Sequence, residues 1–162
     1  MLGKEDSDIT EQANKFFYYD EGLSPEIGRT LAHVGFSLEV GEKGRLDEDI
    51  IPEMGRKRQS WVTKDDRSRI QHESLILEAG ISIVFLRGLS HDGRKRSSMR
   101  RNTINLKQQL LLLVTKLDVI QQEISLLRRP RYFILYLKGL NKPEVEKHST
   151  LREVWERLSG SE

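Results

Sequence analysis

Acidic side chains occur at three points where the sequence predicts that a strand ends or a helix begins. Asp20 and Glu21 follow an aromatic run, Asp47 opens a helical pattern after a glycine-containing loop, and Asp65 and Asp66 follow Ser-Trp-Val-Thr. Carboxylate oxygens favour Mg²⁺ or Mn²⁺, and such ions activate water and stabilise charge during displacement at phosphorus. The pattern therefore predicts a divalent-metal site for phosphodiester chemistry, provided that the fold brings these side chains together.

Each acidic residue also has a simpler explanation when it is taken alone. Asp47 and Asp66 are suited to capping a helix, and Asp20 is suited to a turn. Three acidic helix starts at one edge of a sheet nevertheless favour a metal site, because clustered carboxylates repel one another unless a cation neutralises them.

The elements that position these residues follow from hydrophobic spacing. The aromatic run at residues 16–19 favours a buried strand, and Ser24 and Pro25 suit the N-cap and first position of a helix. Strands are also predicted at 36–40, 60–63, 81–86 and 131–137, and helices at 25–34, 47–58, 68–78, 105–127 and 150–158. The alternation of strand and helix up to residue 86 predicts a parallel sheet whose strand ends share one cleft.

Four segments carry a resemblance to a known family: FYYDEGLSP at 17–25, LDEDIIPEMGR at 46–56, WVTKDDR at 61–67 and EAGISIVFL at 78–86. Together they resemble the PIN domain, most closely the compact PIN-like branch of VapC-type toxins in toxin–antitoxin pairs. The resemblance spans roughly residues 16–88 and implies a Mg²⁺-dependent ribonuclease of a kind often paired with a small antitoxin. It assigns the family's acidic positions to Asp20, Asp47 and Asp65, with Glu21 and Asp66 as adjuncts.

Basic side chains gather just after this region. The cluster comprises Arg87, Arg94, Lys95, Arg96, Arg100 and Arg101. Residues 1–66 carry 15 acidic and 9 basic side chains, whereas residues 67–162 carry 10 and 18. An acidic half joined to a basic half is typical of a metal site beside an anion-binding surface. The cluster is either part of a solvated loop or, if a metal site lies beside it, a set of side chains that bind the phosphate backbone of RNA.

Composition excludes several other functions. The chain has no cysteine, which excludes disulfides, thiol catalysis and thiolate zinc sites and suits a reducing compartment such as the cytoplasm. No apolar run is long enough to predict a membrane span. Four histidines are scattered among different predicted elements and predict no metal site.

The predicted helix at 105–127 has more apolar surface than one sheet face requires. Its stripe comprises Leu106, Leu110, Leu113, Leu117 and Ile124, and Leu111, Leu112, Val119 and Leu126 widen it. The surplus predicts a homodimer or an antitoxin-type partner docked there. Changing Leu112 and Val119 to Glu is then expected to give a folded monomer.

The sequence as a whole predicts one α/β domain, a three-layer PIN-like sandwich with a mostly parallel sheet and a C-terminal helical extension. Its divisions are a flexible tail at 1–14, the PIN-like domain at 15–140, and a linker at 141–148 leading into the final helix within 141–162. The predicted function is RNA cleavage by metal-activated water. The alternative is a non-catalytic PIN-like interaction module that binds a protein partner.

Overall fold

One mixed sheet organises the computed structural model, which describes residues 15–64, 71–87, 105–138 and 142–158. Six described strands follow the order β2-β1-β3-β4-β5-β6. They are β1 (Phe17–Tyr19), β2 (Leu38–Val40), β3 (Ser60–Thr63), β4 (Ile83–Leu86), β5 (Tyr132–Lys138) and β6 (Lys142–His148). The strands β1 to β5 pair in parallel, and β6 pairs antiparallel with β5. The prediction of a mostly parallel sheet is confirmed.

The helices begin at local signals that the sequence displays. They are α2 (Pro25–His33), α3 (Asp47–Lys57), α5 (Glu73–Ala79), α6 (Leu106–Leu126) and α7 (Leu151–Leu158). Ser24 caps α2 as predicted, because its Oγ accepts a hydrogen bond from the Ile27 N–H at 3.4 Å. Asn105 and Gln108 form a capping box at the start of α6. Among the described helices, none is long and apolar enough to cross a membrane.

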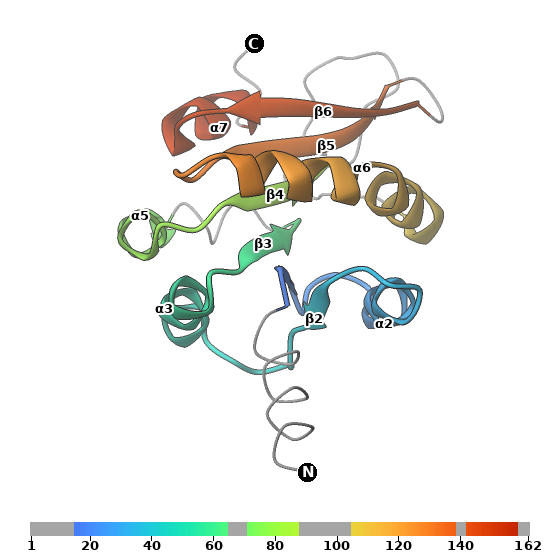
Figure 1. The fold of residues 1–162 in the computed structure, drawn as a ribbon, viewed down its shortest axis with the longest axis horizontal. Coiled ribbons are helices and arrows are strands. Elements are labelled where there is room, and N and C mark those ends of the chain that lie inside the picture. The colour runs from blue at the N-terminus through green and yellow to red at the C-terminus, as the bar shows by residue number, and fades with distance from the viewer. Residues whose placement is uncertain (1–14, 65–70, 88–104, 139–141, 159–162) are drawn as a thin grey trace.

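Side chains on the central strands alternate between two apolar cores. Phe17, Tyr19 and Val62 contribute to the core under α2 and α6, whereas Tyr18 and Trp61 contribute to the core under α3, α5 and α7. Figure 1 shows α3 and α5 on one side of the sheet and α2 on the other. Because β1 is covered on both faces, it needs an apolar side chain at every position, which explains its aromatic run. The predicted three-layer α/β architecture is confirmed.

The strand β6 corrects one prediction. Residues 141–148 were expected to be a polar linker, but Lys142–His148 is the edge strand of the sheet. Its sequence alternates charged side chains around Pro143 and Val145, and Val145 packs partly against the core of α2 and α6. Charges and proline are common on edge strands because they discourage pairing with another chain. The same polarity made the segment resemble a linker.

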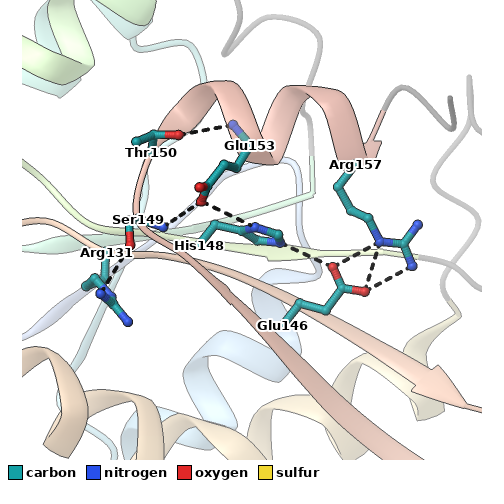
Figure 2. A network of polar contacts seen from close by, with 7 residues as sticks. All are labelled: Arg131, Glu146, His148, Ser149, Thr150, Glu153 and Arg157. Carbon is teal, nitrogen blue, oxygen red and sulfur yellow. Dashed lines mark hydrogen bonds and ion pairs between the residues drawn. The ribbon is translucent and has the colours of Figure 1, made fainter. Parts of the chain in front are cut away.

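A polar network fastens α7 to β6, as Figure 2 shows. Glu146 on β6 accepts hydrogen bonds from the Arg157 guanidinium, with Nε 3.0 Å from each carboxylate oxygen. The His148 ring lies between two carboxylates, with Nε2 3.2 Å from Glu146 Oε1 and Nδ1 3.7 Å from Glu153 Oε1. Thr150 Oγ1 accepts the Glu153 N–H and caps the helix. The predicted final helix is therefore present and fixed to the sheet.

The orientation of α6 differs from the predicted stripe. Gln109, Leu112, Leu113, Leu117 and Ile120 face inward and are buried. By contrast, the side chain of Leu106 is 58% exposed and that of Leu110 is 38% exposed. Leu113 and Leu117 of the stripe are buried as predicted, but in the first turns the inward position belongs to the polar Gln109, which bonds to the end of β1. Placing Leu112 at the surface was therefore wrong, and a Glu at this position cannot test dimer formation.

Candidate functional site

The candidate site lies where the strand order of the sheet reverses. The chain passes from β1 to the edge strand β2 and then returns past β1 to β3, so β1 and β3 flank the switch point. In open α/β sheets, ligands bind outside the carboxyl ends of the strands at such a point. Asp20 is the first residue after β1, and its N–H donates to the Val62 carbonyl at 2.9 Å. This bond sets Asp20 beside Thr63, the last residue of β3.

The Asp20 side chain is held in one orientation. It is 5% exposed, and its two oxygens accept separate N–H groups. Oδ1 accepts from the indole Nε1 of Trp61 at 3.3 Å, and Oδ2 accepts from the backbone N–H of Gly22 at 3.2 Å. The fully buried Trp61 thus fixes the carboxylate across the switch point. The sequence indicates Asp20 but not Trp61, because the role of Trp61 depends on strand pairing.

Glu21 points to the loop that follows β2. Its Oε2 accepts a hydrogen bond from the Gly44 N–H at 2.8 Å. Arg45 in the same loop donates two hydrogen bonds to Glu53 on α3, at 3.2 and 2.8 Å. The loop is therefore held on one side by the residue next to Asp20 and on the other by α3.

Asp47 begins α3, as the sequence predicts, and lies near a histidine. The distance from Asp47 Oδ2 to His72 Nε2, at the N-cap of α5, is 3.7 Å. The sequence does not indicate this contact, because His72 belongs to the start of a different helix. Within the described ranges, no three Asp, Glu or His side chains form a metal-binding group, so Asp20, Glu21 and Asp47 do not cluster by themselves.

The remaining predicted site residues fall into two groups. Arg87 follows β4, and its N–H donates to the Leu135 carbonyl at 2.9 Å, which places it at the carboxyl edge beside β5. Lys64, which was not among the predicted site residues, follows β3 at the same edge. The other predicted residues lie outside the described residues: Asp65, Asp66, Arg94, Lys95, Arg96, Arg100 and Arg101.

A buried polar clamp shapes the turn that carries Asp20. The Tyr19 hydroxyl donates to the Ser24 carbonyl at 2.5 Å and lies 3.1 Å from Oε1 of Gln109. The same Gln109 oxygen accepts the Ser24 N–H at 3.2 Å. One side chain on α6 thus fixes both ends of the turn from β1 to α2. A glutamine among leucines was the available signal, but its contacts lie 85 and 90 residues away in the sequence.

Tyr18 brings a neutral phenol close to the same edge. Burial raises its pKa to about 12, so the hydroxyl keeps its proton at neutral pH. No described residue makes a hydrogen bond with this buried hydroxyl. The hydroxyl lies close to Gly41: a Cβ atom added at position 41 would be 2.7 Å from the hydroxyl oxygen of Tyr18. Position 41 therefore requires glycine because the backbone passes so near to the phenol.

The Arg45–Glu53 pair predicts a specific pH dependence. Hydrogen bonding to Arg45 lowers the pKa of Glu53 to about 2. A carboxyl whose pKa falls on folding stabilises the protein above its unfolded pKa of about 4.3 and loses that contribution as pH falls to 2. Glu53→Gln is expected to cost about 1 kcal/mol at pH 7, because both side chains are partly exposed. Urea denaturation should show the deficit at pH 7 shrinking below about pH 4.5, whereas a deficit independent of pH would contradict this assignment.

Comparison with known proteins adds no identity: no family model, curated protein or solved structure matches this chain.

Proposed function

We propose that this chain is a Mg²⁺- or Mn²⁺-dependent ribonuclease whose reaction centre lies around Asp20. The observation that carries the proposal is the buried Asp20 carboxylate, oriented by two N–H donors at the switch point between β1 and β3. Ligands of α/β sheets bind at this point. A further support is the resemblance of the segments around Asp20, Asp47 and Asp65 to PIN-like ribonucleases.

The donors at this edge suit a hard cation. Asp20 and Asp47 offer carboxylate oxygens, which Mg²⁺ and Mn²⁺ prefer over nitrogen or sulfur. Asp65 and Asp66 follow Lys64 directly in the sequence, so chain length allows them to reach the same edge. When bound, the cation would supply a Lewis acid and lower the pKa of a water molecule.

The protein's own groups would then position the RNA. Asp20 would hold the cation without rearranging, because Trp61 and Gly22 already fix its oxygens. Lys64 and Arg87 would hold backbone phosphates at the strand ends, as Lys and Arg do in nucleic-acid complexes. Glu21 would keep the loop after β2 in place through Gly44 rather than bind the cation. The basic residues at 94–101 are still proposed to bind the phosphate backbone of RNA, further from the reaction centre.

Cleavage of a labelled single-stranded RNA panel tests this function. The purified protein is expected to cut RNA with Mn²⁺ or Mg²⁺, to stop when EDTA is added, and to resume when the cation is restored. Cleavage that persists in excess EDTA would contradict the metal-dependent mechanism. Absence of cleavage across the panel with either cation would contradict the ribonuclease function.

A second candidate, a non-catalytic interaction module, is favoured by the outer surface of α6. Leu106, Leu110 and Val114 repeat every four residues and are 58%, 38% and 49% exposed. An apolar stripe of this kind is typical of a helix-docking surface. A homodimer or an antitoxin-type protein is therefore kept as the alternative partner, and sedimentation of the purified chain distinguishes self-association from a monomer.

A further inference from the structure

A groove of about 340 Å³ lies between α5 and α7, apart from the residues around Asp20. Its described lining comprises Glu73, Arg152, Trp155 and Glu156. Both helices pack on the same core, and Figure 1 shows them near each other on one side of the sheet. The residues combine an aromatic ring with groups of both charges.

The indole of Trp155 is fixed in this groove. Its ring meets Phe85 edge-on, with centroids 5.7 Å apart, and its Nε1 donates to Glu73 Oε1 at 2.6 Å. The indole bond engages one oxygen of Glu73. Among the described residues, no hydrogen bond or ion pair involves Arg152. The groove therefore offers a rigid ring, a partly used carboxylate and a guanidinium.

These groups match the hydrogen-bonding edges of guanine. Its N1–H and N2–H₂ are adjacent donors that suit a carboxylate, and its O6 and N7 are adjacent acceptors that suit a guanidinium. Adenine and cytosine place an acceptor beside their amino group, and uracil has a single donor between two acceptors. Aromatic side chains stack on the bases of single-stranded RNA. We propose that this groove is a guanine-binding subsite, in which Trp155 stacks on the base, Glu73 accepts from N1–H and N2–H₂, and Arg152 donates to O6 and N7.

A basic side chain from a protein partner is the competing occupant. Two carboxylates and an indole attract a cation, but Arg152 lines the same groove and would repel a second positive charge. The mixed charge favours a neutral base with both donors and acceptors.

Two consecutive residues, His72 and Glu73, connect the proposed site around Asp20 and Asp47 with the guanine subsite. His72 lies 3.7 Å from Asp47, and the next residue, Glu73, lines the groove. The inference rests on the proposed ribonuclease function for its choice of ligand, and it adds that the enzyme selects RNA with guanine near the cut.

Tryptophan fluorescence in EDTA tests binding separately from cleavage. Trp61 is fully buried, so quenching by added nucleotide reports chiefly on Trp155. Guanosine monophosphate is expected to bind at least about tenfold more tightly than the adenosine, cytidine and uridine monophosphates. Glu73→Gln should remove this preference. The amide oxygen of the glutamine can still accept from the Trp155 indole, but its NH₂ group would then face the N1–H and N2–H₂ donors of guanine. Glu78→Gln, on the exposed side of α5, is the matched control and should keep the preference.

Three results would overturn the subsite: equal affinity for the four nucleotides, a guanine preference unchanged in Glu73→Gln, or tighter binding of N-acetylarginine amide than of guanosine monophosphate. The outcomes separate this inference from the proposed function. RNA cleavage without guanine preference overturns the subsite alone. Guanine-selective binding that Glu73→Gln abolishes supports the subsite even if no RNA is cleaved, in which case the ribonuclease function fails.

Discussion

Asp20→Asn is expected to lower metal-dependent RNA cleavage by about 100-fold or more. The substitution replaces the charged carboxylate that we propose as a metal ligand with a neutral amide, at the point where the strand order reverses. Time courses of RNA cleavage with saturating Mn²⁺ measure the effect. Activity within a few-fold of the parent would show that Asp20 is not part of the reaction centre.

The same variant is expected to remain folded but to lose about 1 kcal/mol of stability. Trp61 and Gly22 both donate to the Asp20 carboxylate, and an asparagine can present an acceptor to only one of them. Removing a charge would raise the stability only if other carboxylates crowded Asp20, and the described residues include no group of three acidic or histidine side chains that could hold a metal. Asp49→Asn, an exposed residue in the first turn of α3, is the matched control and should affect neither cleavage nor stability.

Leu112→Glu is expected to unfold the protein or to destabilise it by about 4 kcal/mol or more. Leu112 is fully buried in the core beneath α6, so the new carboxylate would lose its hydration without gaining a partner. Far-ultraviolet circular dichroism and urea denaturation measure the loss. A soluble variant with the stability of the parent would show that α6 is rotated relative to the structure.

Val119→Glu is the control on the same helix. Val119 is 53% exposed, and glutamate at such a position should change stability by no more than about 0.5 kcal/mol. Equal destabilisation by both variants would contradict the assigned faces of α6. If α6 mediates self-association, the Val119 variant alone should weaken it while the fold persists.

The central part of the fold could be predicted because local signals and packing agree there. The aromatic run in β1, Ser24 and Pro25 at the start of α2, and the β-branched pattern before residue 86 each specify one element. β6 could not be predicted, because an edge strand with a solvated face lacks the apolar alternation by which strands are identified. The first turns of α6 were misplaced because the inward residue there is Gln109, which the leucine pattern does not indicate.

Residues of the candidate site could be predicted only where they stand at the end of a strand or the start of a helix. Asp20 and Asp47 lie at the strand end and helix start that the sequence indicates. The contacts of Trp61, Gln109 and His72 join elements that are distant in the chain, so no spacing within the sequence indicates them.

Thermal melting with added Mn²⁺ tests the central claim most directly, because it detects the cation without requiring the correct RNA. At 100 times its dissociation constant, a bound ion stabilises the folded state by about 2.7 kcal/mol, or roughly 5–10 °C for a chain of this size. The parent and Asp49→Asn are expected to show this rise, and Asp20→Asn is expected to lose most of it. The absence of a shift in the parent, or an equal shift in Asp20→Asn, would contradict a metal centre at Asp20.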